Sequence, residues 1–420
     1  HVANSWGKDK LPFSERIQWT KDNQEMLCAI AENPYDNRQW TKLDLSEAWL
    51  ALAAAFEWAG YVREGLAFVS HIPVGMDGTC SGLQHYAALL RDETTARQVN
   101  VCPGDRPADV YRAVADRTNE RLKTLVGSGD ADGTYAAEWL ALGILDRKMT
   151  KRSVMTLPYG STLFTCKDYV FERYRELRHA TPDKKLGPWD TFSDQHKACC
   201  WLGTQIWHAI EDVLSFAPAA MRALQKTARI MSKAKLPLNW TAPSGFRVQQ
   251  ANVCYDARRI RLATGGDVVY RTVEGAESGP WEDESLPRSM QLTFAEPTDE
   301  IDASKQASGV APNFIHSLDA SALVLTVCKL LDDGVTHYAM IHDSFATHAC
   351  NAALMARRLR EAFVEQYSGD PFADLYHEFM QMLTVIGDMK SVDEVQEIYR
   401  GLPYGTFDVS KVKESLYFFA

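Results

Sequence analysis

The nine cysteines of this 420-residue chain include no C-x-x-C pair and no Cys/His cluster with zinc-ligand spacing. The sequence therefore predicts neither a zinc module nor a disulfide framework, and reduced thiols of a cytoplasmic protein fit it best. Basic residues are not in excess, because 45 Lys and Arg stand against 55 Asp and Glu, giving a formal net charge of −10. This balance argues against a protein that coats nucleic acid over its whole surface, while a basic cleft stays possible.

Long hydrophobic runs are also scarce. The most apolar stretch that we find, residues 48–60, is too short for a membrane-spanning helix and carries Glu57. No signal-peptide pattern opens the chain, which starts at His1 rather than Met, so we expect an upstream region to be missing. With 46% hydrophobic residues the chain can bury a large core, and we expect two or three subdomains.

Hydrophobic periodicity predicts helices over residues 14–60, 105–178 and 195–235, the second of them interrupted once, at Leu157-Pro158-Tyr159-Gly160. Residues 65–76 are strand-like, and a helix follows Asp77-Gly78. Alternation over residues 246–275 predicts a hairpin turning at residues 264–267, and residues 273–302 have the composition of an exposed excursion. A helix is predicted for residues 312–331 with Pro312 in its first turn, and two short strands for residues 338–349.

Two carboxylates stand at predicted strand ends. Asp77 is followed by small residues up to Gly82, and Asp343 follows an apolar strand that ends at His342. Mg²⁺ typically takes one or two protein carboxylates, while water and substrate phosphates complete its shell. If the chain returns to one sheet, the pair could hold two ions about 3.5–4 Å apart. Taken alone, Asp77 would more often be a turn or helix-capping residue, because Asp is favoured at such positions.

Between these aspartates, Arg147, Lys151, Met155 and Tyr159 recur at a spacing of four, which places them on one helical face. Arg147 and Lys151 could reach one polyphosphate, and Tyr159 could stack on a base or sugar. An amphipathic helix with solvated basic residues is the alternative.

The first aspartate segment fits other kinds of site less well. Ser81 stands one place too late for a G-x-S-x-G hydrolase elbow, and the alternating acidic ligands of a calcium loop are missing. Cys80 beside His85 leaves a cysteine hydrolase open.

Three motifs follow one another along the chain: Asp77-Gly78-x-Cys80-Ser81-Gly82-x-Gln84-His85, the Arg147/Lys151/Tyr159-Gly160 series and His342-Asp343-Ser344. In this order they resemble motifs A, B and C of the single-subunit DNA-directed RNA polymerases of T-odd bacteriophages and mitochondria, and the phage branch in particular. The likeness continues through residues 308–317 and the C-terminal Phe418-Phe419-Ala420.

The resemblance implies an α+β fold, a right-hand polymerase palm with a mainly helical fingers insertion. Residues 1–93 would form the first part of the palm, residues 94–316 the fingers, and residues 317–420 the second part of the palm. The N-terminal promoter-binding and thumb region would be absent from these residues. In the natural protein it would lie in the same polypeptide or in a separate chain. The family's D-x-x-G-R element is also missing from these residues.

The resemblance further implies roles for single residues. Asp77 and Asp343 would bind two Mg²⁺ ions, with the Gly78 carbonyl as a further ligand. Lys151 and Arg147 would hold the incoming triphosphate, and Lys151 would also protonate the leaving pyrophosphate. Tyr159 and His316 would monitor the ribose. Pro158 departs from the phage pattern, and its missing N–H should end or kink the helix before Tyr159.

The implied reaction is DNA-templated RNA synthesis from ribonucleoside triphosphates. The partners would be a DNA template, a promoter and the RNA transcript, with no membrane, in the cytoplasm of a phage-infected bacterium. The predicted hairpin near residues 250–275 occupies the place of the family's promoter-specificity loop. Arg259 and Arg261, two apart in a strand, would read guanine edges there, unless the hairpin is an ordinary surface feature.

Two rivals remain. A related DNA polymerase is disfavoured because Gly78-Thr79-Cys80-Ser81 stand where that family presents a bulky acidic residue that blocks the 2′-hydroxyl. A noncatalytic nucleic-acid-binding subunit is disfavoured because both aspartates and Lys151 are retained.

Overall fold

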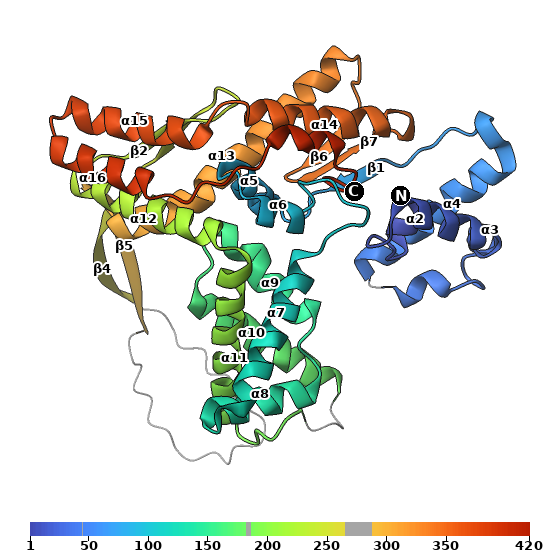
Figure 1. Ribbon diagram of the computed structural model, residues 1–420, viewed down its shortest axis with the longest axis horizontal. Helices are drawn as coiled ribbons and strands as arrows, with labels where there is room; N and C mark the ends of the chain where they lie inside the picture. Colours follow the sequence, from blue (N-terminus) through green and yellow to red (C-terminus); the bar gives the residue numbers. More distant parts are fainter. Residues whose placement is uncertain (44, 182–185, 265–287) are drawn as a thin grey trace.

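The computed structural model describes residues 1–43, 45–181, 186–264 and 288–420 (Figure 1). Over these ranges the fold is α+β, as predicted, with many helices and three antiparallel sheets in the orders β1-β7-β6, β2-β3 and β4-β5. Figure 1 shows the β1-β7-β6 sheet in the upper body, a group of helices below it, and the N-terminal helices to one side. The site described below lies where these three parts approach one another.

The central sheet joins segments from both halves of the chain. It consists of β1 (Val74–Asp77), β6 (Tyr338–Ile341) and β7 (Ser344–Thr347). Strand β7 pairs with β1 from Val74↔Thr347 to Asp77↔Ser344 and with β6 on its other side. The predicted strand pair around His342-Asp343 is confirmed. The strand-like stretch 65–76 was predicted too long, because Gly65–Ala67 forms a 3₁₀ turn and β1 begins only at Val74.

The sheet is backed by α5 (Ser81–Leu89), α13 (Ala303–Asp332) and α14 (Ala352–Gln366), with α6 (Glu93–Gln98) beside them. Every residue of α5 is buried. Length and composition alone would let α13 span a membrane. Its contacts with α5, α12 and α14 and its buried Phe314, Ile315 and Leu318 are those of a core helix.

The predicted start of α13 was wrong. The helix begins at Ala303, where the Asp302 side chain accepts hydrogen bonds from the Ser304 and Lys305 N–H groups, and Pro312 lies inside it. Asp is a strong N-cap residue, and this cap fixes the start of the helix nine residues before Pro312. A proline inside a helix cannot donate to the carbonyl four residues earlier, here that of Ser308. Gly160 packs against this position, since a Cβ on it would lie 3.5 Å from the Ser308 carbonyl oxygen.

The lower helices in Figure 1 are α7 (Val110–Leu125), α8 (Ala131–Leu142), α9 (Arg147–Thr156), α10 (Leu163–Ala180) and α11 (Phe192–Val213). The break at residues 157–160 is confirmed, but α7, α8 and α9 are also separated from one another, at Gly129 and Gly143. Both glycines have a positive φ, and an aspartate N-cap follows each of them. Trp139, Tyr174 and Trp189 pack together in this part.

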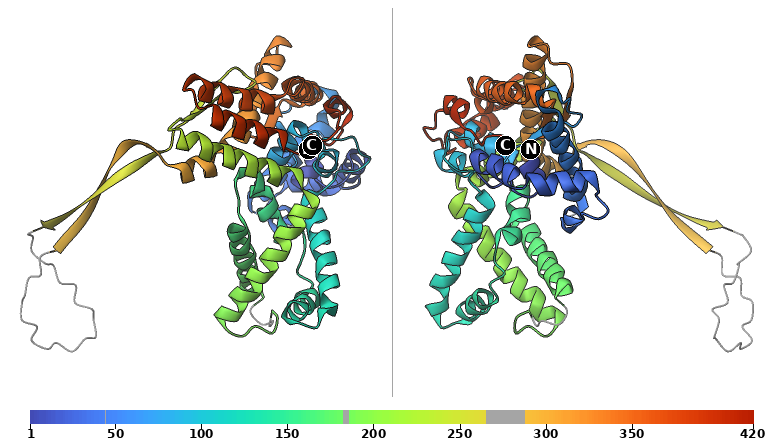
Figure 2. Two further views of the ribbon diagram at one scale, coloured as in Figure 1. Left: turned by 60° about the vertical axis from the view of Figure 1, so that its left-hand side comes forward. Right: turned by 90° about the vertical axis from the view of Figure 1, so that its right-hand side faces the viewer.

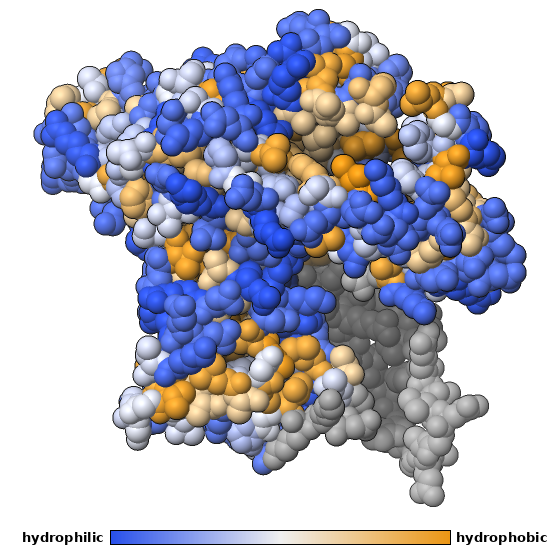
Figure 3. Space-filling view, turned by 45° about the vertical axis from the view of Figure 1, so that its right-hand side comes forward, coloured by the Kyte–Doolittle hydropathy of each residue, from blue (hydrophilic) through white to orange (hydrophobic). Residues whose placement is uncertain are grey.

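Hydrophobic groups also reach the surface of this lower part, as Figure 3 shows. Phe164 and Phe192 are 74% and 67% exposed. The next helix, α12 (Phe216–Lys233), is separate from α11, so the helix predicted over residues 195–235 is divided in two. Beside it lie α15 (Pro371–Val385), α16 (Met389–Arg400) and the small hairpin of β2 (Leu238–Thr241) and β3 (Arg247–Gln250).

A hairpin of β4 (Val253–Thr264) and β5 (Arg288–Ile301) projects far from the body (Figure 2). A hairpin was predicted here, but with the wrong second strand. Thr264 pairs with Arg288, so residues 288–301, predicted as an exposed excursion, are the partner strand. The predicted turn at residues 265–267 and the rest of the connection, up to residue 287, lie outside the described residues.

The N-terminal helices are α1 (Val2–Ser5), α2 (Phe13–Asp22), α3 (Gln24–Glu32) and α4 (Leu45–Glu64). They have a core of their own, formed by Trp6, Leu27, Ile30, Ala51 and Ala55. The predicted subdomain boundaries at residues 93 and 316 remain predictions, although the second falls within α13.

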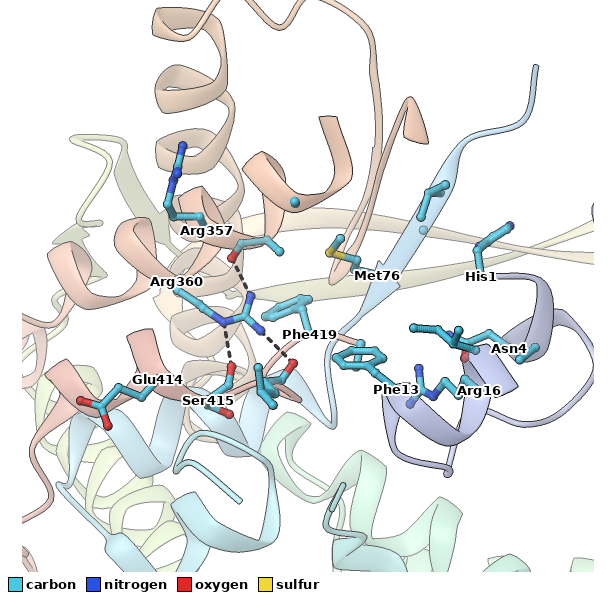
Figure 4. A pocket seen from close by; sticks show the side chains of 18 of the residues that line it. His1, Asn4, Phe13, Arg16, Met76, Arg357, Arg360, Glu414, Ser415 and Phe419 are labelled. Carbon is cyan, nitrogen blue, oxygen red and sulfur yellow. Dashed lines mark hydrogen bonds between the residues drawn. The ribbon is translucent and has the colours of Figure 1, made fainter. Parts of the chain in front are cut away.

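A cavity of about 730 Å³ separates α1 and α2 from β1, α14 and the C-terminal segment (Figure 4). On its wall Arg360 donates hydrogen bonds to the carbonyl oxygens of Ala356, Ser415 and Leu416, at 2.6, 2.8 and 3.0 Å. This guanidinium ties the C-terminal segment to α14. Phe419 then bridges to Gly78, and the Ala420 N–H donates to the Asp77 carbonyl oxygen at 3.3 Å.

Candidate active site

Asp77 and Asp343 lie at the same end of the central sheet. Asp77 is the last residue of β1, and Asp343 lies in the two-residue turn between β6 and β7. The Gly78 N–H donates to the Asp343 carbonyl oxygen at 3.2 Å. His342, the other turn residue, has a φ of 54°, in the left-handed region that residues other than glycine seldom adopt. The chain thus returns to one sheet, as the pairing of the two aspartates requires.

The charge of Asp343 affects the protonation of Asp77. Burial and, next, the charge of Asp343 raise the pKa of Asp77 to about 6, against the lowering effects of the Gly78 N–H, Lys10 and Lys151. Like charges at one site favour protonation, and a cation between them favours the ionised form. The electrostatics of this sheet end therefore favour a bound cation.

The candidate metal ligands at this end, the two carboxylates and the Gly78 carbonyl, are oxygen donors, and His342 Nδ1 lies 3.0 Å from Asp343 Oδ1. Among the described residues no group of three or more His, Cys, Asp or Glu side chains is arranged to hold a metal. Mg²⁺ does not need such a group, because one or two carboxylates suffice when substrate phosphates and water complete its shell. The Gly78 carbonyl accepts one hydrogen bond, from the Cys80 N–H at 3.1 Å, and its oxygen has a second lone pair. The residues present therefore fit magnesium.

Two lysines act on Asp77 from different parts of the chain. Lys151, on α9, is exposed and makes no ion pair with any residue that the structure describes. Lys10 precedes α2, and its ammonium lies 2.8 Å from the Asp9 carboxylate. The sequence prediction missed Lys10, which belongs to no pattern and reaches the site only through the packing of the N-terminal helices.

Arg147 has a partner in this conformation. Its Nε donates to the Asp109 carboxylate at 2.5 Å, and its guanidinium lies 5.0 Å from the centre of the Tyr111 ring. Asp109 also caps α7. Arg147 therefore joins α9 to α7. The prediction that Tyr159 shares the helical face of Arg147 and Lys151 was wrong, because α9 ends at Thr156 and Tyr159 lies in the 3₁₀ turn Leu157–Tyr159.

That turn brings Tyr159 to His316. Pro158 ends the helix, as predicted, and packs on Gly82, where a Cβ would lie 2.7 Å from the proline ring. The rings of Tyr159 and His316 stack with centres 4.7 Å apart, and the His342 ring lies 6.3 Å from Tyr159 and 5.8 Å from His316. The structure thus places the two predicted ribose-reading residues together, beside the turn that carries Asp343.

Asp319, which the sequence prediction missed, lies behind these rings. It is 6% exposed, one helical turn after His316 on α13. Its Oδ1 lies 2.8 Å from His85 Nε2, and its Oδ2 lies 3.4 Å from Ser81 Oγ, 3.5 Å from the Tyr159 hydroxyl and 3.4 Å from His342 Nε2. Its only sequence signal is the three-residue spacing from His316, which is too common to identify a site.

Cys80 is unsuited to be a nucleophile. It is 7% exposed, and burial raises the pKa of its thiol to about 12, so almost no thiolate is present at neutral pH. His85 is hydrogen-bonded to Tyr367 and Asp319 instead. The cysteine hydrolase is therefore disfavoured.

The two arginines predicted to contact DNA lie in β4, far from the carboxylates. Arg259 pairs with Thr293 and is exposed, and Arg261 pairs with Gln291. Their contact with DNA stays a prediction.

Comparison with known proteins agrees with the motifs. The family model described as DNA-dependent RNA polymerase matches residues 1–402. T7 RNA polymerase of Escherichia phage T7 is 33% identical over 91% of this chain and 44% of its own length. The DNA-directed RNA polymerase of Enterobacteria phage K11 is 32% identical over 91% of this chain and 43% of its own length. Mitochondrial DNA-directed RNA polymerase 1 of Arabidopsis thaliana is 32% identical over all of this chain and 39% of its own length.

The chain thus spans about 40% of the length of the relatives that it matches. The family match covers far more than half of the chain and includes every residue of the candidate site. The chain therefore belongs to the family of DNA-dependent RNA polymerases.

Proposed function

We propose that this chain carries the nucleotidyl-transfer site of a DNA-templated RNA polymerase, which joins ribonucleoside triphosphates to an RNA 3′-hydroxyl and releases pyrophosphate. The observation that carries the proposal is the position of Asp77 and Asp343 at one sheet end, with Lys151 and Lys10 acting on Asp77. A right-hand palm formed by the central sheet, with a fingers insertion of α7 to α11, is the architecture that we infer.

Asp77, Asp343 and the Gly78 carbonyl would hold the two Mg²⁺ ions. When bound, the ions would activate the attacking hydroxyl and stabilise the leaving oxygen. The protein groups supply the fixed negative charge that keeps the ions at one place. The strand register and the Gly78-to-Asp343 hydrogen bond support this role, because they hold both carboxylates on rigid backbone.

Lys151 would bind the incoming triphosphate and give a proton to the departing pyrophosphate. Its exposure and its lack of an ion pair among the described residues leave the ammonium available. Lys10 would add a second compact charge. Arg147 would join them only by exchanging its bond to Asp109 for a bond to phosphate. The protein's contribution is thus mostly positioning and charge stabilisation.

Tyr159 and His316 would read the ribose. Their stacking beside His342 supports this role, because it places both polar groups next to the proposed metal site. A deoxyribonucleotide would leave one of these groups without its partner.

The DNA template, the promoter and the RNA transcript would be the partners. Arg259 and Arg261 on the projecting hairpin would contact the promoter in a major groove. The phage relatives support action in the cytoplasm of an infected bacterium, and the upstream part of the relatives would supply the promoter-binding and thumb region.

Extension of a labelled RNA primer on a DNA template with Mg²⁺ tests this proposal. Both the 420-residue chain and the longest natural form of the protein should be used. We expect extension with ribonucleotides and none by Asp77→Asn, which should still bind the primed template. Binding without extension by the natural form would support a noncatalytic subunit, and a preference for deoxyribonucleotides would support a DNA polymerase.

A further inference from the structure

We propose that Asp319 is a positioning residue that turns the Tyr159 hydroxyl into a hydrogen-bond acceptor for the ribose 2′-hydroxyl. This inference rests on the proposed function, because it concerns how that same site selects its substrate. Asp319 would not touch the substrate; it would fix the direction of the hydrogen bond that reads the sugar.

A chain of hydrogen bonds fixes one side of Asp319. The Gln366 side-chain N–H donates to the Tyr367 hydroxyl at 3.4 Å, and that hydroxyl lies 2.5 Å from His85 Nδ1. Burial holds the pKa of Tyr367 well above its usual range, so the phenol keeps its proton and donates it to Nδ1. His85 must then carry its own proton on Nε2, which lies 2.8 Å from Asp319 Oδ1. Asp319 is therefore an acceptor on this side.

The same surroundings keep Asp319 ionised. Burial alone would raise its pKa, but His85, His342 and the Ser81 hydroxyl together lower it. The cavity between Asp319, His85 and His342 measures about 10 Å³, at the lower limit of the space that one water needs. Protein donors, rather than solvent, must therefore satisfy the carboxylate. An ionised carboxylate can accept hydrogen bonds but has no proton to donate.

The hydroxyl protons of Ser81 and Tyr159 can then be counted. The two oxygens lie 3.2 Å apart, and they lie 3.4 and 3.5 Å from Asp319 Oδ2. Both hydroxyls can donate to Asp319, or either one can donate to the other while the other donates to Asp319. In all three arrangements the single Tyr159 proton points inward, toward Asp319 or Ser81. A fourth arrangement, in which Ser81 donates to Asp319 and the Tyr159 proton turns away, gives the buried carboxylate one donor fewer and is therefore disfavoured. These distances exceed those of an ordinary O–H···O bond, so the buried charge, rather than a short bond, sets the orientation.

An inward proton leaves only lone pairs of the Tyr159 oxygen on the side away from Asp319, where the proposed function places the ribose. The sugar must then donate. A 2′-hydroxyl or a 2′-amino group can do so, whereas a 2′-fluorine can only accept and a 2′-hydrogen can do neither. The structure therefore predicts discrimination by the donor capacity of the 2′-substituent, and not simply by its polarity or size.

The experiment measures kcat/KM for single addition of four cytidine triphosphates that carry 2′-hydroxyl, 2′-amino, 2′-fluoro or 2′-hydrogen, using the longest natural form of the protein. We expect the parent to prefer 2′-amino over 2′-fluoro by roughly tenfold, in the range of one unmade hydrogen bond, and to treat 2′-fluoro like 2′-hydrogen. If the parent adds the 2′-fluoro and 2′-amino substrates with equal kcat/KM, the Tyr159 hydroxyl is not the acceptor. This part of the experiment needs no variant.

Asp319→Asn then tests the positioning role. The amide is similar in shape but uncharged, so the Tyr159 proton is free to turn outward, and the amino-to-fluoro ratio should fall below about threefold. In Tyr159→Phe the same Asp319→Asn change should have no effect on the ratio, because the hydroxyl through which it acts is gone. Ser81→Ala should keep the parent ratio, since Asp319 still accepts the Tyr159 proton.

The outcomes are separable. A general loss of structure would lower addition of all four substrates alike without moving the ratio, and an unchanged ratio in Asp319→Asn overturns the role of Asp319. The role of Asp319 is also overturned if Asp319→Asn changes the amino-to-fluoro ratio equally in the parent and in Tyr159→Phe. A parent that adds no ribonucleotide at all overturns the proposed function itself, and with it this inference.

Discussion

Metal binding at the two aspartates should weaken as the pH falls through 6. A carboxylate must lose its proton before it binds a cation, so proton and metal compete for Asp77. Burial and the charge of Asp343 raise the pKa of this group to about 6 in the metal-free protein. An ordinary aspartate, with a pKa of about 3.9, would be ionised throughout this range. The pH dependence between 5 and 7 therefore reports on the pairing of the two carboxylates.

The size of the effect follows from the fraction of Asp77 that is ionised. With a pKa of about 6, the affinity at pH 5 should be about tenfold lower than at pH 7, whereas a carboxylate of ordinary pKa would change it by only about a tenth. Because the Asp77 side chain is more than a third exposed, water screens part of the repulsion, and tenfold is an upper bound.

The affinity can be measured with Mn²⁺ as a probe, from the electron paramagnetic resonance signal of the free ion, at pH 5, 6 and 7. Asp77→Asn should bind weakly and without this pH dependence. Asp116→Asn, the same substitution at an exposed site on α7, should behave like the parent. A parent whose affinity changes less than twofold between pH 7 and 5 would refute the reasoning.

His342 needs its own control, because its imidazole also gains a proton as the pH falls. Burial lowers its pKa, but the hydrogen bond to Asp343 and the charges of Asp319 and Asp77 raise it overall. Protonated His342 would repel a cation. In His342→Gln the loss of affinity at pH 5 should persist if Asp77 is the titrating group. Its disappearance would assign the effect to the histidine.

Asp343→Asn should abolish primer extension while leaving binding of the primed template within about twofold, and extension at the parent rate would exclude Asp343 from the metal site. Lys151→Met should raise KM and lower kcat for nucleotide addition, whereas Lys148→Met on the same helix should change neither. Equal effects of the two substitutions would show that the general positive charge of the helix, and not Lys151 in particular, matters. Tyr159→Phe should keep most of the rate and raise relative deoxyribonucleotide incorporation by about one to two powers of ten in competition assays, and unchanged selectivity would exclude its hydroxyl as the sensor. Arg360→Met removes the side-chain donor to the carbonyls of Ala356, Ser415 and Leu416, of which the bond to Ser415 is buried. It should destabilise the protein by about 1–3 kcal/mol in urea unfolding, and a change below about 0.5 kcal/mol would show that the carbonyls find other donors.

What the sequence could predict was local or already marked by the family motifs. Asp77 and Asp343 stand after apolar runs that form strands, and Pro158 ends α9 because it lacks an N–H. The breaks after α7 and α8 were equally local. Gly129 and Gly143, each followed by an aspartate cap, are ordinary stop and start signals that the hydrophobic pattern obscured.

The remaining errors have tertiary causes. The partner strand of β4 begins at Arg288, beyond a segment whose composition is that of a loop, and pairing rather than composition makes residues 288–301 a strand. Arg147 carries the charge that a triphosphate needs, but only the packing of α9 against α7 shows that Asp109 already binds it. Such partners come from other parts of the chain, and no periodicity indicates them.

Asp319 shows why a motif identifies only part of a site. The motifs name the groups that would touch metal and substrate, yet these groups are held by contacts between motifs: Ser81 from the first, Tyr159 from the second and His342 from the third all face one carboxylate. That carboxylate comes from α13, outside the three motifs, and it is buried, so it can serve only as a fixed acceptor. Under the proposed function, chemistry at the sheet end and selection of the sugar would therefore be coupled through Asp319. A substitution there should change selectivity and the placement of His342 together, whereas a change in Tyr159 should affect selectivity alone.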